Sequence, residues 1–155
     1  MHTVDMKLEV VVIPVADVER SKRFYSGLEW RLDADFSVGD SFHAVQFTPP
    51  GSPCSIHFGK GITDAAPGSA RGLYLIVSDI IAARAVLLEH GVDVSQVFHT
   101  LAPGKPFLSG PHPQRQSYSS FATFKDPDGN SWLLQEVTAR LPGRVSATDT
   151  RRLSS

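Results

Sequence analysis

The 155-residue sequence contains a single cysteine, Cys54, and no surplus of charge of either sign. One thiol cannot form an intrachain disulfide, and it excludes a structural zinc site built from several cysteines. Fifteen Lys and Arg stand against sixteen Asp and Glu, which gives a formal net charge of −1. Because no positive surplus is available to hold a phosphate backbone or an anionic membrane, we expect neither nucleic acid nor a membrane as a partner.

Long apolar runs are also absent near the start of the chain. The longest one there covers residues 10–16 and is interrupted by Pro14, and the acidic residues Asp5 and Glu9 precede it instead of a basic leader. This pattern predicts neither a signal peptide nor a membrane span. With 41% hydrophobic and 20% charged residues, the composition is typical of a globular protein, which we expect to be cytoplasmic.

What the sequence does contain is an internal repeat. Residues 8–15 and 73–77 are β-branched runs, and each is followed by a helical pattern that ends at a glycine, Gly27 or Gly91. Asp17 is a credible N-cap for the first helix, and Ser78 or Asp79 for the second. The two halves of the chain therefore follow one plan.

Three β-like runs follow each predicted helix, so each half reads β-α-β-β-β. They cover residues 30–38, 42–48 and 55–59 in the first half, and 92–99, 119–125 and 130–137 in the second. Asp126-Pro127-Asp128-Gly129 has the residues of a type I hairpin turn and joins the last two runs.

We expect one domain over residues 1–140, built from module one at 8–62, a linker at 63–70 and module two at 71–138. Residues 141–155 lose hydrophobic periodicity and are predicted to form a flexible tail. Residues 101–116 are rich in Pro and Gly, which predicts a long loop without regular structure. That loop is either a lid or an idle insertion.

The duplicated plan resembles the vicinal oxygen chelate superfamily of glyoxalase I, bleomycin-resistance proteins and extradiol dioxygenases. Three segments carry the resemblance in order along the chain, at residues 12–25, 72–87 and 124–137. The resemblance implies an α+β fold of two tandem βαβββ modules, each curling a mixed sheet into a half-open cup with its helix outside.

The metalloenzymes of this superfamily hold one divalent ion with four side chains, which implies ligands at four positions of this sequence. Three of these positions fall on Val10, Gly72 and Leu133, and the fourth falls on Ser55 or, with a two-residue slip, on His57. Since at least three of them carry no imidazole or carboxylate, we expect no metal ion and no other cofactor.

Strand alternation still locates the cavity, because residues two apart share a face and the ligand positions point inward in the family. The lining is expected to be apolar with a few polar tips, which suits a flat or aromatic small molecule. The predicted ligand-binding residues are Val10, Val12, Ser55, His57, Gly72, Tyr74, Ile76, Leu133 and Gln135.

The polar members of this set each have an alternative interpretation. His57 is a general base, a residual metal ligand, a hydrogen-bond donor or a solvent-facing side chain. Tyr74 offers stacking and a phenol, although buried tyrosines bonded to a backbone carbonyl are more common than catalytic ones. An unpaired buried amide is costly, so Gln135 is expected to contact the ligand, a water or His57.

Other aromatic and imidazole side chains are assigned to packing or to the surface. Trp132 alternates with Leu133 and is expected to pack against a helix. His43, His99 and His112 lie on or beside the connections at the predicted cavity, and each is expected to be a surface histidine.

The leading hypothesis is a metal-independent protein of the bleomycin-resistance type that sequesters an apolar or aromatic metabolite. The rival is an enzyme: a divergent glyoxalase or dioxygenase with a non-standard metal set around His57, or a metal-free isomerase or cyclase that uses His57 or Tyr74. An open cup with apolar rims is poorly covered in a monomer, so we expect a homodimer.

Overall fold

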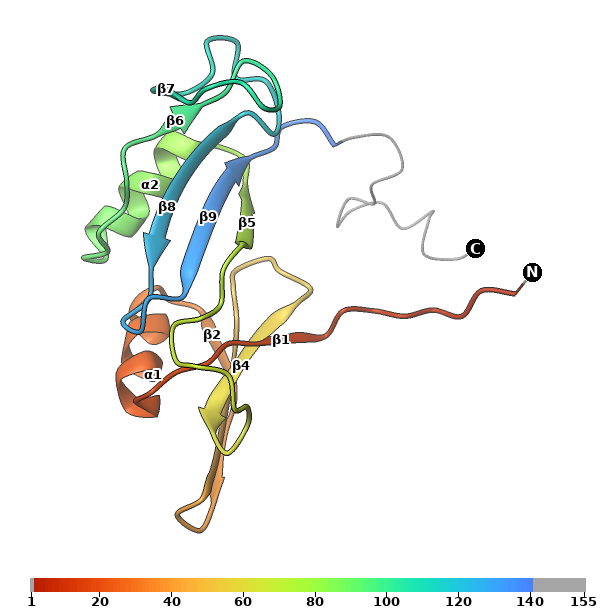
Figure 1. Cartoon of the computed structure of the whole chain (residues 1–155), viewed down its shortest axis with the longest axis vertical. Helices are drawn as coiled ribbons and strands as arrows, with labels where there is room; N and C mark the ends of the chain where they lie inside the picture. The colour runs from red at the N-terminus through yellow and green to blue at the C-terminus, as the bar shows by residue number, and fades with distance from the viewer. Residues whose placement is uncertain (1, 141–155) are drawn as a thin grey trace. The chain divides into compact units, whose positions relative to one another are not determined.

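The computed structural model describes residues 2–140 and divides into two compact units. The first contains residues 2–73 together with Phe124–Trp132, and the second contains Tyr74–Thr123 with residues 133–140. Figure 1 shows the course of the chain. The predicted tail at 141–155 lies outside the described residues. Over residues 2–140, no helix combines the length and the apolar character that crossing a membrane requires.

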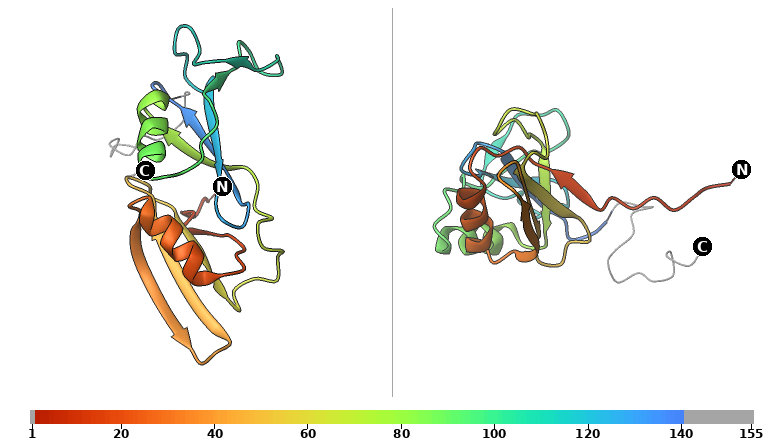
Figure 2. Two further views of the ribbon diagram at one scale, coloured as in Figure 1. Left: turned by 90° about the vertical axis from the view of Figure 1, so that its left-hand side faces the viewer. Right: turned by 90° about the horizontal axis from the view of Figure 1, so that it is seen from below.

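The first unit holds a four-stranded sheet with one helix. Its elements are β1 (Val10–Val12), α1 (Val18–Gly27), β2 (Arg31–Val38), β3 (Phe42–Thr48) and β4 (Ser55–Lys60). The strand order is β1-β4-β3-β2, with β1 parallel to β4 and the other pairs antiparallel. Figure 2 shows α1 lying along one face of this sheet.

Helix α1 begins where the sequence predicts it. The Asp17 carboxylate accepts a hydrogen bond from the backbone N–H of Arg20 at 3.1 Å, which caps the first turn. The helix buries Tyr25 completely against the stacked rings of Phe47 and Phe58. These three aromatic residues form the centre of the core between α1 and the sheet.

The turn at residues 126–129 belongs to the same unit and is fixed to α1 by buried polar contacts. The Tyr25 phenol donates to Asp126 Oδ2 at 2.8 Å and accepts from the indole N–H of Trp132 at 3.1 Å. Burial raises the pKa of Tyr25, so the phenol stays neutral. Trp132 is 4% exposed, which confirms the prediction that it packs against a helix.

The segment predicted as a linker also packs within this unit. The backbone N–H of Gly68 donates to the carbonyl of Pro14 at 3.0 Å. Gly68 has a φ of +79°, and a Cβ there would lie 2.0 Å from the carbonyl oxygen of Asp128. Only glycine fits such a close approach of two backbones.

The second unit centres on a five-stranded sheet, in the order β5-β9-β8-β6-β7. The elements of this sheet and its helix are β5 (Leu73–Val77), α2 (Ile80–Glu89), β6 (Phe98–His99), β7 (Leu108–Ser109), β8 (Ser120–Lys125) and β9 (Ser131–Glu136). The first residue of β5, the end of β8 and the start of β9 belong to the first unit. With two helices and mixed sheets of four and five strands, the α+β fold class is confirmed.

The N-terminus of α2 is held by charged groups. Asp79 caps it and accepts from the N–H groups of Ile81 and Ala82. The Glu136 carboxylate, 1% exposed, accepts from the N–H of Ile80 at 2.8 Å and from Arg115 Nε at 2.8 Å. The hydrogen bonds from Arg115 hold the pKa of Glu136 below its usual value, despite the opposing effect of burial.

Three predicted elements differ from those in the structure. The first strand is shorter, and the run predicted at residues 92–99 forms a strand only at Phe98–His99, because Val92, Val94 and Val97 are buried in an irregular segment. A run of β-branched residues predicts a strand from sequence, but here these residues are buried without strand pairing. The loop at residues 101–116 is not without regular structure, since β7 lies within it and pairs with β6.

Candidate functional site

The predicted ligand-binding residues fall on two sheets. On the four-stranded sheet lie Val10, Val12, Ser55 and His57, and on the five-stranded sheet lie Tyr74, Ile76, Leu133 and Gln135. Gly72 immediately precedes β5, has a φ of +74° and has open space around the position of a Cβ. The predicted ligand-binding residues therefore form two groups, one on each sheet.

The first group lies on the sheet face that α1 does not cover. Val10 pairs with Ser55 and Val12 with His57, and on the next strand Gln46 pairs with His57. The buried Ile56 and Phe58 alternate with Ser55 and His57, and Phe58 contacts Tyr25 of α1. Residues two apart on a strand share a face, so His57 and Ser55 point away from the helix.

The two polar members of this group differ in how they are bonded. Ser55 donates to the hydroxyl of Thr48 at 2.6 Å, because the Thr48 hydroxyl donates its own proton to Asp33. Within residues 2–140, the half-buried imidazole of His57 has no side-chain hydrogen bond. His57 is thus the polar group of this face that is available to a ligand.

On the five-stranded sheet, the last strand has one buried and one open face. Trp132, Leu134 and Glu136 are buried, and Glu136 bonds to the start of α2, so Leu133 and Gln135 point to the opposite, open face. The Gln135 amide donates to the carbonyl of Tyr118 at 3.1 Å. The amide oxygen of Gln135 has no protein partner among the described residues, so it is available to a bound molecule.

Three phenylalanine side chains form an aromatic cluster in this unit, which the sequence did not predict. Phe98 of β6 pairs with Phe121 of β8, and their rings stack with centroids 5.6 Å apart. Phe107 meets both rings edge-on, at 5.1 Å from Phe98 and 6.1 Å from Phe121. Phe121 alternates with the buried Ala122, so the cluster lies on the open face, as Leu133 and Gln135 do.

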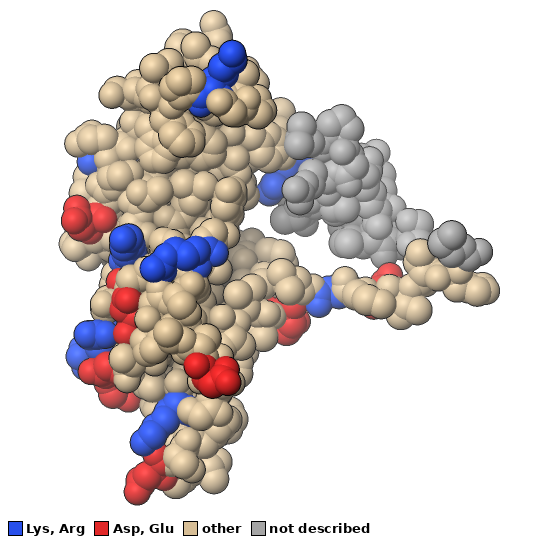
Figure 3. All heavy atoms as spheres, in the orientation of Figure 1, with Lys and Arg blue, Asp and Glu red and all other residues tan. Residues whose placement is uncertain are grey.

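The cluster is accessible and lies on a surface with little charge. Phe107 is 66% exposed, although aromatic rings of this size are usually buried. Where Figure 1 draws β8 and β9 in front, Figure 3 shows a surface made almost entirely of uncharged residues. Exposed apolar patches on protein surfaces are often sites for a ligand or a partner.

The side chains of Tyr74 and Ile76 on β5 are exposed to solvent. They are 58% and 40% exposed, while Leu73, Leu75 and Val77 between and beside them are half-buried. Ile76 also lines a shallow depression next to α2. Both side chains are therefore free to contact another molecule.

The histidines expected at the surface occupy other environments. His43 is half-buried and lies 2.6 Å from Asp35, on the strand face that α1 covers. His99 and His112 are only 6% and 4% exposed, so their assignment to the surface was wrong. They are buried because the chain at residues 108–116 folds over them: His99 donates to the Gly110 carbonyl, and His112 Nδ1 accepts from the Gln114 N–H.

No arrangement of ligating side chains replaces the missing metal positions in the described part of the chain. Over residues 2–140, no three His, Cys, Asp or Glu side chains lie close enough together to hold a metal ion. The fourth family position falls on Ser55 or His57, and of these two His57 would supply one neutral donor. One imidazole is a weak site for a divalent ion.

The family of the protein is defined by sequence and fold together. Residues 7–134 match the model of the glyoxalase/bleomycin resistance protein/dioxygenase superfamily, and the chain belongs to this superfamily. None of the curated proteins matches the chain.

Solved structures share this fold over most of the chain. TnmS3, an antibiotic binding protein from Streptomyces sp. CB03234, is 30% identical with a TM-score of 0.66 and covers 88% of this chain and 99% of its own. A glyoxalase/bleomycin resistance protein from the same organism is also 30% identical, with a TM-score of 0.62 over 84% of this chain and 100% of its own. A superfamily member from Sphaerobacter thermophilus DSM 20745 is 27% identical, with a TM-score of 0.62 over 85% and 98% of the two chains.

Proposed function

We propose that this protein sequesters a flat aromatic small molecule, which it binds against the open face of its five-stranded sheet without a metal ion. The cluster of Phe98, Phe107 and Phe121 carries the proposal, because two half-buried rings support the 66% exposed ring of Phe107, which offers stacking surface to a ligand. The similarity to an antibiotic binding protein at 30% identity supports the same kind of function.

Gln135 supplies a hydrogen-bonding group that can orient a ligand on this face. Its amide is held by the Tyr118 carbonyl, which leaves the amide oxygen to accept a hydrogen bond from a bound molecule. An apolar surface with a small number of fixed polar groups is the usual composition of a small-molecule site. The ligand is therefore an aromatic compound with at least one hydroxyl or N–H donor.

The residue types at the family's ligand positions support metal independence. Val10, Gly72 and Leu133 have no donor atom in their side chains, and an isolated imidazole at His57 does not complete a coordination sphere. Metal analysis of the purified protein is expected to find less than one equivalent of divalent ion. One bound equivalent that is required for ligand binding would contradict this part of the proposal.

The four-stranded sheet carries exposed apolar residues on the face away from α1, and for this reason we also propose a twofold homodimer. Val12 and Phe36 of this sheet are 41% and 54% exposed. Pairing with a second copy would cover such surfaces. Light scattering that gives the mass of a monomer at high protein concentration would count against the pairing.

The binding test uses 2-naphthalenemethanol, a neutral flat alcohol, and cyclohexylmethanol as its non-aromatic match. Phe107→Ser is expected to weaken binding of the aromatic probe by about 1 kcal/mol, roughly fivefold in Kd. Leu101→Ser is the matched control, because Leu101 is an exposed apolar residue nearby, 56% accessible, and belongs to none of the ring contacts. Equal effects of the two substitutions in titration calorimetry would refute stacking on the cluster.

A metal-free isomerase or cyclase is the second candidate, favoured by the unbonded imidazole of His57 on the other open face. Imidazole is the side chain that enzymes use most often as a general acid or base. Turnover of a bound ligand that His57→Ala abolishes, with ligand affinity unchanged, would replace sequestration by catalysis.

A further inference from the structure

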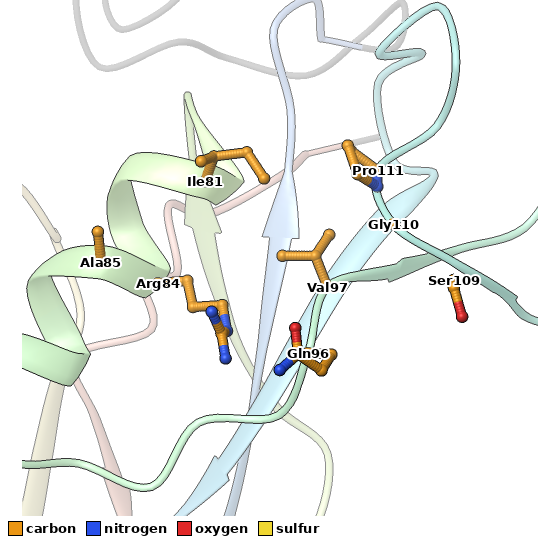
Figure 4. A pocket seen from close by; sticks show the side chains of 8 residues that line it. All are labelled: Ile81, Arg84, Ala85, Gln96, Val97, Ser109, Gly110 and Pro111. Atoms are coloured by element: carbon orange, nitrogen blue, oxygen red, sulfur yellow. The ribbon is translucent and has the colours of Figure 1, made fainter.

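A pocket lies between α2 and the chain around β6 and β7. It is separate from the open face of the sheet that the proposed function uses. It measures about 430 Å³, within the size range of about 300–1,000 Å³ that small-molecule sites occupy. Figure 4 shows how its side chains converge. Those that matter for binding are Ile81, Arg84, Ala85, Gln96, Val97 and Pro111.

The walls of the pocket are mostly aliphatic. Ile81 and Ala85 project from α2, and Val97 and Pro111 lie opposite them. Val97 is 7% exposed, whereas Ile81 is 47% exposed although isoleucine is among the residues most often buried. A ligand with an aliphatic body would therefore cover apolar surface that now faces solvent.

Arg84 is the only charged residue among those that line the pocket. Its Nε donates to the carbonyl of Ser95 at 2.7 Å, which fixes the plane of the guanidinium group. Across residues 2–140, the two terminal amino groups of Arg84 take part in no hydrogen bond or ion pair. Figure 4 shows the guanidinium directed towards the side of the pocket formed by Gln96.

The wall opposite α2 is held in place before any ligand binds. The Gly110 N–H donates to the carbonyl of Val97 at 2.8 Å, and Nδ1–H of the buried His99 donates to the carbonyl of Gly110 at 2.7 Å. The N–H of His112 donates to the hydroxyl of Ser120 at 2.9 Å. Because this part of the 101–116 loop is fixed at three points, little ordering entropy is lost on binding.

We propose that this pocket binds a small aliphatic monocarboxylate, whose carboxylate pairs with the terminal amino groups of Arg84 while its carbon chain packs between Ile81 and Val97. A planar guanidinium with two free amino groups matches a carboxylate in geometry and charge. One cation among aliphatic walls compensates one negative charge, so a monoanion fits better than a phosphate dianion. This site is separate from the aromatic face and does not depend on the proposed function.

The test uses cyclohexanecarboxylate and its neutral match, cyclohexanecarboxamide, in NMR titrations of the full-length protein. The carboxylate is expected to shift the amide signals of Val97 and Gly110 at millimolar concentration, and the carboxamide to bind at least about tenfold more weakly. Arg84→Gln should weaken carboxylate binding by at least about tenfold, the effect of losing one charge-assisted pair. Arg23→Gln, at an exposed arginine of α1, is the matched control and should leave binding unchanged.

A second variant tests the pocket without touching the charge. Ala85→Phe adds a ring on the exposed side of α2 and should block the carboxylate while Arg84 remains. The proposal is overturned if Arg84→Gln and Arg23→Gln have equal effects, if Ala85→Phe binds as the parent protein does, or if the carboxylate produces no shifts. Shifts at Phe98 and Phe121 alone would also overturn it, since they would place the probe on the aromatic face. A failure here leaves binding of 2-naphthalenemethanol unaffected, so the two proposals fail independently.

Discussion

The two helices hold equivalent places in their modules and are fixed by partly different chemistry. Both have an ion pair at their first turn, between Arg20 and the buried side chain of Asp128 at α1 and between Arg115 and the buried Glu136 at α2. Helix α1 has in addition an aromatic contact in the core, in which Tyr25 joins Trp132 and the Asp126 carboxylate. The duplicated plan therefore repeats the ion pair at each helix, while the aromatic contact belongs to α1.

The two helices also differ in how many apolar side chains they expose to solvent. Helix α2 exposes Ile81, Val86 and Leu88, whereas over Val18–Gly27 no large apolar side chain is exposed. The first module thus has a helix with one apolar face, and the second has a helix that is apolar on most sides. The second helix therefore has exposed apolar surface that another molecule can cover, which is where the pocket at Arg84 lies.

The largest effect is expected from removing the aromatic contact of α1. Trp132→Ala should lower the free energy of unfolding by about 3–5 kcal/mol, through the cavity left beside Tyr25. Tyr25→Phe, which keeps the ring and removes the hydroxyl, should cost about 1–2 kcal/mol. Urea denaturation measures both, and a cost below about 1 kcal/mol for Trp132→Ala would show that α1 does not depend on this contact.

A smaller loss is expected from breaking the ion pair of α2. Arg115→Met should cost about 2 kcal/mol, because it leaves the buried Glu136 with the N–H of Ile80 as its main partner. The cost is reduced from that of a fully buried pair, since the Arg115 side chain is 40% exposed. Arg23→Met on α1 is the control, and an equal loss there would remove the distinction between the helices.

The two attachments should also fail at opposite ends of the pH scale. The pKa of Glu136 is lowered in the folded state, so its contribution is present above the usual 4.5 and is lost as pH falls through the folded value. The pKa of Tyr25 is raised, so its contribution is present below the usual 10.0 and is lost as pH rises above that value.

Unfolding free energies measured across pH test this contrast. Glu136→Gln should flatten the acid side of the profile alone, and Tyr25→Phe the alkaline side alone. If either variant flattens both sides, the two attachments are coupled and the contrast between the modules is wrong.

The smallest effects are expected on the two open faces. Gln135→Leu removes a bond to the Tyr118 carbonyl and should cost about 1 kcal/mol of stability. His57→Ala removes no side-chain hydrogen bond and should change stability by less than about 0.5 kcal/mol. If Gln135 also orients the aromatic ligand, Gln135→Leu should weaken its binding by about 1–3 kcal/mol in calorimetry. Unchanged ligand binding would place the polar contact elsewhere on the face.

The fold was largely predictable because its signals are local. The N-caps at Asp17 and Asp79 and the turn at residues 126–129 each depend on three or four neighbouring residues. The N-cap occurs once in each module, and the order of these signals along the chain matches that of the family. The facing of Trp132 followed from alternation, which holds along any regular strand.

What could not be predicted depends on contacts between distant residues. The ring cluster forms because β6 pairs with both β7 and β8. Since β6 has only two residues, its sequence pattern could not predict this pairing. The burial of His99 likewise depends on the path of the chain around Gly110. Arg115, in a loop expected to be irregular, carried no signal of its pairing with Glu136. Each of these features is set by tertiary packing, on which single-sequence periodicity carries no information.

The close approach at Gly68 limits how this chain can be cut or extended. The segment between the two modules is held in place at Gly68. The N–H of Gly68 donates to the carbonyl of Pro14, and the Cα of Gly68 lies against the carbonyl of Asp128. An inserted tag or a new terminus at this point would have to displace the turn at residues 126–129. Gly104, which has open space around it in a surface loop, is the better position for a fusion or a circular permutation.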